Sequence, residues 1–266
     1  MADNSATQTL LERFKDVPLV PVASHEGAPV FCRVGGFMLI QLNRPAQHNR
    51  LDPADVDGMQ VLLDQLAADR SIRALVITGS GDRTFSSGYT LQAIASELDK
   101  RFERMLDSLE SLPQVTLVSF NGSVYGGATD MALCCDLRLG VPGMRMFMPA
   151  ARFAMHYYPG GLRRYVNKLG LSAASKLFLT GMTIESDEML RIGFLNEIVA
   201  RDGLAHRTEE YLAAIEMTDA AVVGMMKAHL RQVAERTADY ANLEQVYQRS
   251  LASDELKNRL GAMLKR

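Results

Sequence analysis

Residues 115–140 read VTLVSFNGSVYGGATDMALCCDLRLG, and the pattern changes twice within this stretch. It begins with a short apolar run rich in β-branched residues, which is typical of a buried strand. Asn121-Gly122 interrupts that run, and Gly126-Gly127 then leads into an apolar helix over about 128–135. The stretch closes on alternating residues that indicate another strand. It therefore predicts a strand, a glycine-rich loop, a helix and a second strand.

The same alternation extends toward the N-terminus. Residues 30–34 and 37–42 predict two strands joined by a turn at Gly35-Gly36. Asp52-Pro53 predicts a helix start, with the aspartate as N-cap and the proline at the first helical position. Strands and helices alternate in this way up to about residue 140, and such alternation favours parallel pairing. The sequence therefore predicts an α/β core.

The C-terminal part of the chain has a different pattern. After Ser172 the sequence is nearly all helical, and from about residue 205 apolar residues recur at helical spacing. We therefore predict two regions: an α/β core over residues 1–204 and a helical appendage over residues 205–266.

Composition excludes several classes of protein. The 266 residues carry a net charge of −2, so no basic surface for nucleic acid is expected. No apolar run approaches the ~18 residues of a membrane helix, and no signal peptide is visible. The three cysteines have no C-x-x-C spacing, so neither a zinc site nor a disulfide framework is predicted, and a cytoplasmic location fits best. Arg163-Arg164 is expected to be a solvated surface pair.

Two loops are candidates for chemistry: FSSGYTL at residues 85–91 and NGSVYGGATD at residues 121–130. Glycines let a backbone approach a ligand closely. A Gly-Gly pair at a helix start leaves N–H groups without partners, and the helix dipole favours negative charge there. The second loop therefore predicts a site for a developing anion. By spacing alone, two ordinary turns explain these loops equally well.

Motifs along the chain resemble the crotonase, or enoyl-CoA hydratase/isomerase, superfamily from about residue 37 to the C-terminus. In order they are LNRP (42–45), HNRL (48–51), VITG (76–79), FSSG (85–88), NG to Gly127 (121–127), CDLR (135–138), LTG (179–181), GFLN (193–196) and AMLKR (262–266). Their order and spacing carry the resemblance. It implies a crotonase-type core of repeated ββα units, in which parallel strands and helices form a spiral. It also implies a trimer or a dimer of trimers, with the C-terminal helices serving in oligomerisation or as a lid.

The resemblance also implies roles for particular residues. The N–H groups of Tyr89 and Gly127 would form an oxyanion hole, and Asp130 would be the catalytic acid or base. Family hydratases have a glutamate at that position, so the side chain here is one methylene shorter. The residues expected to contact substrate are Gln47, Ser87, Gly88, Tyr125, Gly126 and Lys265. For Lys265, a solvated terminal lysine is the alternative.

Two positions depart from the hydratase pattern. Ala150 follows Pro149, where hydratases have a second glutamate, and Thr90 replaces a frequent aspartate. Adding water needs one group that activates water and another that delivers a proton, so ordinary two-carboxylate hydration is not expected. His156 is a candidate proton donor or base, since imidazole titrates near neutral pH. A histidine bonded to a carbonyl is the open alternative. Tyr157 and its neighbour Tyr158 are expected to pack, although both could donate hydrogen bonds.

Three functions remain open at this point. The resemblance implies an enzyme that acts on an acyl-CoA thioester through an enolate, with coenzyme A as part of the substrate and no further cofactor. One alternative is a decarboxylase of the methylmalonyl-CoA type, which needs only enolate stabilisation and one proton donor. The other is a non-catalytic crotonase fold that binds coenzyme A or an acyl carrier protein. No metal, nucleic-acid or membrane partner is predicted.

Overall fold

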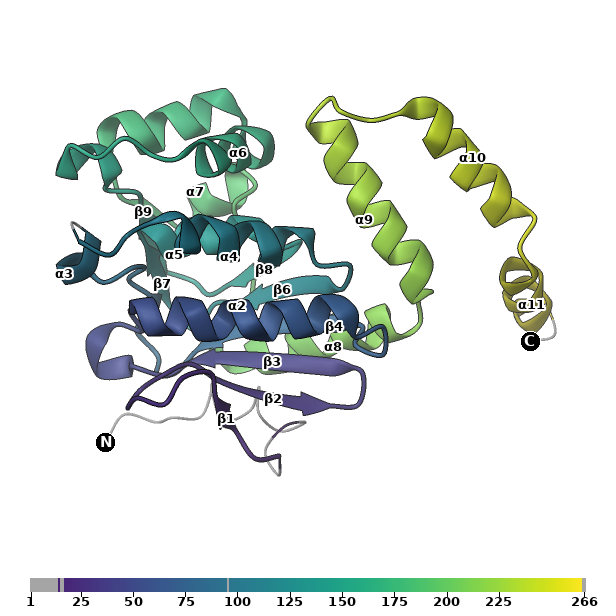
Figure 1. The fold of residues 1–266 in the computed structure, drawn as a ribbon, viewed down its shortest axis with the longest axis horizontal. Coiled ribbons are helices and arrows are strands. Elements are labelled where there is room, and N and C mark those ends of the chain that lie inside the picture. Colours follow the sequence, from purple (N-terminus) through teal and green to yellow (C-terminus); the bar gives the residue numbers. More distant parts are fainter. Residues whose placement is uncertain (1–13, 15–16, 95, 265–266) are drawn as a thin grey trace. The chain divides into compact units, whose positions relative to one another are not determined.

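The computed structural model describes residues 14, 17–94 and 96–264 (Figure 1). The chain forms two compact units, Met1–Gly224 and Met225–Arg266. Among the described residues, no helix combines the length and the apolar character that crossing a bilayer requires.

A seven-stranded sheet forms the centre of the first unit. Its strands lie in the order β1 (Val20–Pro21), β2 (Val30–Val34), β3 (Phe37–Leu42), β4 (Ala74–Gly79), β6 (Val115–Ser119), β8 (Leu137–Gly140) and β11 (Glu197–Ile198). The first three strands pair antiparallel, and every pairing from β3 to β11 is parallel. All residues of β3 and β4 are buried, as expected for parallel strands covered on both faces. The predicted α/β class with parallel pairing is confirmed.

A smaller sheet brings the two glycine-containing loops together. Its strands lie in the order β10 (Ile184–Glu185), β9 (Arg145–Phe147), β7 (Ser123–Tyr125) and β5 (Thr84–Ser86). Strands β5 and β7 are parallel neighbours. Because parallel neighbours end at the same edge of a sheet, the loop after β5 and the loop after β7 meet there. These are the two loops that the sequence identifies.

The first unit also contains helices, which lie beside the sheets. They are α2 (Pro53–Ala68), α3 (Leu91–Ile94), α4 (Lys100–Ser111), α5 (Gly127–Cys134), α6 (Pro159–Thr180), α7 (Ser186–Arg191) and α8 (Leu204–Glu216), with short 3₁₀ turns η1 (Pro45–Gln47), η2 (Ala150–Phe153) and η3 (Arg201–Gly203). Helix α4 contacts both α2 and α5, and α5 contacts α6 (Figure 1). Residues Ala128 to Cys134 of α5 are all buried, so this helix lies within the core.

Helix starts follow the predicted local chemistry. Asp52 is the N-cap of α2 and Pro53 its first residue, and Asp55 completes a capping box. Cys134 and Cys135 are buried free thiols, in agreement with a packing role.

The boundary between the two units lies later than residue 204. Helix α8 packs against β6 and β8, so its apolar face is part of the first unit. The second unit holds the rest of α9 (Ala220–Ala234), together with α10 (Tyr240–Leu251) and α11 (Asp254–Met263). None of the described residues of α9, α10 and α11 is buried.

Candidate active site

Two buried asparagines bond the segment that leads into the first of these loops. Asn49 donates hydrogen bonds from Nδ2 to the carbonyl oxygens of Ser80 and Thr84, both at 2.9 Å. Asn121 donates from Nδ2 to the carbonyl oxygen of Gly81 at 2.9 Å. Each asparagine belongs to a motif that carries the family resemblance. Sequence reasoning gave neither of them a role, although both motifs place a turn-forming asparagine beside a glycine-rich or strand-ending segment.

The backbone of Tyr89 faces the start of α5. Leu51 donates to the carbonyl of Gly88 at 2.8 Å and accepts from the N–H of Thr90 at 2.9 Å, so both groups point toward residue 51. Because successive residues of an extended segment point their N–H groups to opposite sides, the N–H of Tyr89 points away from Leu51.

Glycine is required where the two loops meet. A Cβ on Gly88, which has a φ of +85°, would lie 2.8 Å from the nitrogen of Gly127. A Cβ on Gly127 would lie 3.9 Å from the nitrogen of Tyr89. The amides of Tyr89 and Gly127 are therefore close neighbours. In the part of the chain that the structure describes, neither N–H donates to a protein acceptor. The oxyanion role of this pair stays a prediction.

A cavity of about 460 Å³ opens beside these two amides. Such a volume is in the range of small-molecule sites. Among the residues that the sequence singles out, its lining includes Ser87, Tyr89, Gly126, Gly127, Ala150, His156, Tyr157 and Tyr158. Apolar side chains such as Phe102 and Met148 cover much of the remaining wall. Three charged residues from the segment around the start of α4 also line it, namely Asp99, Lys100 and Glu103.

Asp130 lies behind the wall of this cavity. Its side chain is completely buried and is not part of the lining. Arg164 donates from Nε to its Oδ1 at 2.9 Å, and the Tyr158 hydroxyl donates to its Oδ2. The Tyr157 hydroxyl lies 3.4 Å from the same oxygen. Asp130 itself does not line the cavity, and its role as acid or base stays a prediction. The carboxylate is enclosed by an arginine and two tyrosines.

Arg164 is buried, whereas the sequence predicts a solvated surface pair at Arg163-Arg164. The side chain of Arg164 is 0% exposed, and it also contacts Asp107 at 2.8 Å and Glu110 at 3.2 Å. Helix α6 brings this residue between α4 and α5, where only paired charges are tolerated. Arg163 forms a further ion pair with Glu110. Burial disfavours ionisation of Glu110, but the bonds from Arg163 and Arg164 prevail and lower its pKa.

The two tyrosines are neutral hydrogen-bond donors. Burial first, and then the charge of Asp130, raises the pKa of both Tyr157 and Tyr158 well above that of a free tyrosine. A carboxylate only accepts hydrogen bonds, so the proton in the Tyr158–Asp130 contact belongs to the tyrosine. The rings lie with centroids 4.4 Å apart. Sequence reasoning expected both side chains to pack, and the structure adds a bonded partner that it did not foresee.

The other predicted residues occupy different surroundings. His156 is exposed at the cavity wall, and its Nδ1 lies 2.8 Å from the carbonyl oxygen of Tyr157. Tyr125 packs against Phe147, with ring centroids 4.9 Å apart, and is not part of the cavity lining. Gln47 is exposed in η1, also outside this lining. Lys265 lies outside the described residues.

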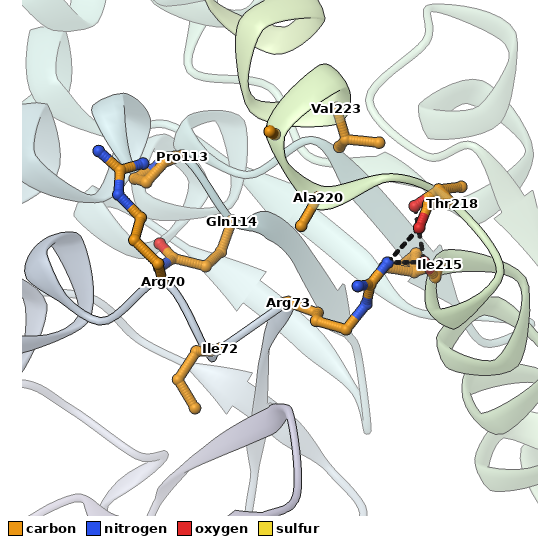
Figure 2. A pocket seen from close by; sticks show the side chains of 10 residues that line it. Arg70, Ile72, Arg73, Pro113, Gln114, Ile215, Thr218, Ala220 and Val223 are labelled. Carbon is orange, nitrogen blue, oxygen red and sulfur yellow. Dashed lines mark hydrogen bonds between the residues drawn. The ribbon is translucent and has the colours of Figure 1, made fainter. Parts of the chain in front are cut away.

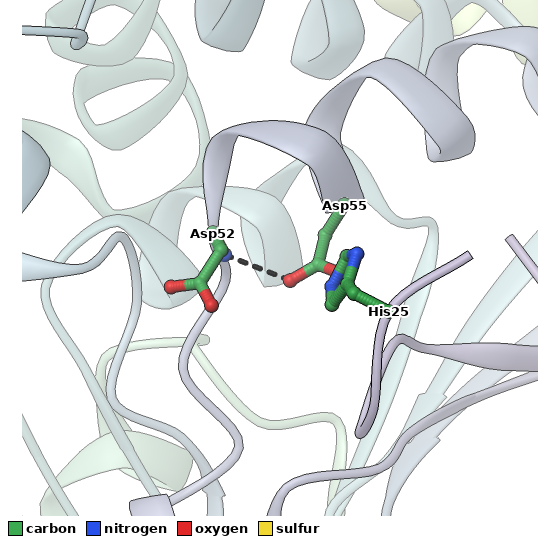
Figure 3. Close-up of side chains that lie close together, drawn as sticks. All are labelled: His25, Asp52 and Asp55. Carbon is green, nitrogen blue, oxygen red and sulfur yellow. Dashed lines mark hydrogen bonds and ion pairs between the residues drawn. The ribbon is translucent and has the colours of Figure 1, made fainter. Parts of the chain in front are cut away.

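A second cluster of titratable groups is balanced internally. His25, Asp52 and Asp55 lie close together near the start of α2 (Figure 3). The guanidinium of Arg44 forms an ion pair with Asp55 and also contacts Nε2 of His25. The backbone N–H of Asp52 donates to Asp55 at 2.8 Å. An arginine thus provides the positive charge that a metal ion would bring to these carboxylates.

Another pocket, of about 320 Å³, lies where the end of α8 meets the start of β4 (Figure 2). Arg73 donates to the carbonyl oxygens of Ile215, at 3.0 Å, and Thr218. The pocket is lined largely by apolar groups, including Ile72 and Val223. Its arginine therefore links two backbone segments, and none of the residues predicted to carry chemistry lies here.

Comparison with known proteins gives one consistent result. The sequence profile of enoyl-CoA hydratase/isomerase matches residues 33–262. A putative enoyl-CoA hydratase/isomerase, YngF of Bacillus subtilis, is 30% identical over 184 residues, which cover 66% of this chain and 71% of that protein. A crotonyl-CoA hydratase of Syntrophomonas wolfei is 25% identical over 210 residues, covering 76% of this chain and 81% of its own.

Solved structures show the same fold. DspI of Pseudomonas aeruginosa superposes with a TM-score of 0.80 and 24% identity, over 91% of this chain and 95% of its own. An enoyl-CoA hydratase/carnithine racemase from Magnetospirillum magneticum superposes with a TM-score of 0.82 and 22% identity, over 91% of this chain and 94% of its own. The crotonase-type fold predicted from the motifs is confirmed.

Proposed function

The chain belongs to the enoyl-CoA hydratase/isomerase family, and from this premise we propose that it is an enzyme that stabilises the enolate of an acyl-CoA thioester. One observation carries the proposal. The N–H groups of Tyr89 and Gly127 are close neighbours at a cavity, and among the described residues neither has a protein acceptor. Two such donors are suited to a thioester carbonyl whose oxygen becomes negative as an α-proton leaves.

The energetic case rests on preorganisation. Both donors belong to the backbone, and Gly127 is the first residue of a buried helix, whose dipole favours negative charge at that end. One donor of this kind is worth about 2.7–4 kcal/mol of transition-state stabilisation in known enzymes. Asn49 and Asn121 bond the segment that leads into the first loop, which limits the reorganisation needed when the charge develops.

The proposed reaction moves a proton without two-carboxylate hydration. Ala150 lines the cavity at the position of the second hydratase glutamate, and Asp130 is already paired with Arg164. A lyase or isomerase reaction that passes through the enolate therefore fits better than addition of water by two free carboxylates. His156 remains a candidate for proton transfer, and Ser87 and Gly126 are proposed to contact the thioester.

Decarboxylation of a malonyl-type thioester is the second candidate. Lys100 lines the same cavity and could bind the carboxylate of such a substrate. Loss of carbon dioxide needs the enolate site and one proton donor, both of which this proposal supplies. A non-catalytic binding protein is the remaining alternative, and turnover of any thioester would exclude it. For the second unit we propose association with other copies, as in the trimers of the family, since its described helices bury no residue.

Gly88→Ala tests the proposal, with Gly143→Ala as its matched control. Both glycines have positive φ, 85° and 74°, so alanine strains both backbones similarly. Only the Cβ at position 88 would meet the Gly127 nitrogen, whereas at position 143 there is nothing within 4 Å. Against a panel of enoyl-, malonyl- and methylmalonyl-CoA, Gly88→Ala should lower turnover ~10²–10³-fold. Gly143→Ala should retain it. Equal turnover in the two variants would contradict the proposal.

A further inference from the structure

We infer that Asp130 exchanges protons with the substrate through the hydroxyl group of Tyr158, which connects the buried carboxylate to the cavity. The inference rests on the proposed enolate chemistry and adds the group that moves the proton. It also explains how Asp130 could act although it does not line the cavity, while Gly127, three residues earlier in the chain, does.

Position along α5 supports this connection. Asp130 is the third residue after Gly127, so it lies about 4.5 Å further along the helix axis and on nearly the same face. The donor N–H of Gly127 and the carboxylate of Asp130 are thus about one turn apart. Tyr158 precedes α6 and lines the cavity, while its hydroxyl donates to Asp130. Tyr158 thus connects the cavity to Asp130, whose short side chain does not reach the cavity.

The proposed step balances without another reactant. As the Cα–H bond of the thioester breaks, its proton binds to the Tyr158 oxygen, and the phenolic O–H proton passes to Oδ2 of Asp130. The electron pair of the broken bond forms the enolate, whose oxygen accepts from Tyr89 and Gly127. Asp130 is then a neutral acid and Tyr158 is again a neutral phenol. The reverse transfer returns a proton to carbon, at the same or at another position of the acyl chain.

Asp130 belongs to a cluster of charged side chains. Arg163 and Arg164 face three carboxylates, those of Asp107, Glu110 and Asp130. Arg164 holds the Asp130 carboxylate in place and also contacts the other two acids.

Exchange of α-protons of butyryl-CoA in deuterium oxide, followed by NMR, measures enolate formation directly. Tyr158→Phe removes the hydroxyl and keeps the ring that packs against Tyr157. It should slow exchange at least ~100-fold with the dissociation constant of butyryl-CoA unchanged, because proton transfer by a placed group is typically worth that much. Asp130→Asn should slow exchange as much, and the double variant no further, since both groups serve one transfer.

Tyr165→Phe is the matched control. This tyrosine also lies on α6 and bonds Thr129, next to Asp130 in sequence, but it does not line the cavity. Its loss should leave exchange within ~3-fold of the parent, because Thr129 keeps its bond to the carbonyl of Gly126. Thermal unfolding of each variant separates loss of fold from loss of chemistry.

The outcomes distinguish this inference from the function on which it rests. A parent protein that is folded but exchanges no α-proton overturns both. Exchange by the parent with a Tyr158→Phe variant within ~3-fold of it overturns the relay alone and leaves the enolate site standing. The relay is also wrong, and the carboxylate is structural, if Asp130→Asn exchanges α-protons at the parent rate. The same follows if the effects of the two substitutions on the exchange rate multiply in the double variant.

Discussion

Two buried aspartate–arginine pairs in this protein look alike and differ in what surrounds them. Asp55 pairs with Arg44 at the start of α2, and Asp130 pairs with Arg164 beside the start of α5. Both carboxylates are 0% exposed. The remaining contacts of Asp55 are the backbone N–H of Asp52 and the His25 ring. Those of Asp130 are the hydroxyl groups of two tyrosines that line a cavity.

This difference shows why a buried ion pair is not by itself a functional signal. At Asp55 the backbone bond closes a helix N-terminus, so the carboxylate serves the fold. At Asp130 the further partners are the hydroxyl groups of Tyr157 and Tyr158, two residues that line the cavity. The two ion pairs are alike in burial and charge. They differ in whether they lie near the donor pair that the N–H groups of Tyr89 and Gly127 form.

Replacing either arginine by methionine should have the largest effect. Arg164→Met and Arg44→Met each leave a buried carboxylate without its guanidinium, and we expect each to lower the free energy of unfolding by about 3–5 kcal/mol. Urea denaturation measures this loss. At a temperature where both variants are folded, Arg44→Met should retain thioester turnover and Arg164→Met should lose it. Equal turnover by Arg44→Met and Arg164→Met would mean that the two ion pairs do not differ in function.

Gly127→Ala should have the next largest effect, about 100-fold on turnover, because a Cβ there would lie 2.9 Å from the Phe102 ring and close to the donor pair. If the collision with Phe102 displaces the helix start, Phe102→Ala in the same chain should recover at least ~10-fold. Steady-state kinetics of the single and double variants check this. No recovery would mean that the added methyl acts by filling the carbonyl site itself.

Much of this arrangement could be predicted from the sequence. The Gly35-Gly36 turn, the Asp52-Pro53 helix start and the alternation that produces parallel strands are local patterns, and each is present in the structure. The motifs also identified the family and the loops that bring Tyr89 and Gly127 together. These features depend on residues that are near each other in the chain.

Contacts between distant segments could not be predicted in the same way. Arg163-Arg164 has the composition of a surface pair, and only the packing of α6 on α4 and α5 buries its second arginine. The bond between Tyr158 and Asp130 joins residues 28 positions apart. Neither residue indicates in sequence that the other is near, so the enclosure of the Asp130 carboxylate by two tyrosines could not be predicted.

The smallest expected effect is on stability at high pH. The pKa of Tyr158 is raised in the folded protein by burial and by Asp130, whereas in the unfolded chain a tyrosine ionises near pH 10. Above that pH the unfolded state releases a proton that the folded state keeps, so stability falls as pH rises through this window. Tyr158 should therefore contribute to the loss of stability across this window. Urea denaturation between pH 9 and pH 11 should therefore show a shallower fall for Tyr158→Phe; parallel curves would mean that the hydroxyl is not held neutral.

Infrared difference spectroscopy of a bound thioester tests the central claim most directly. A non-reacting acyl-CoA labelled with ¹³C at the thioester carbonyl reports the hydrogen bonds that its oxygen accepts. If the amides of Tyr89 and Gly127 bind this oxygen, its stretching band moves to lower frequency on binding, and Gly88→Ala removes most of the displacement. A band at its solution frequency in the bound parent protein would contradict the account.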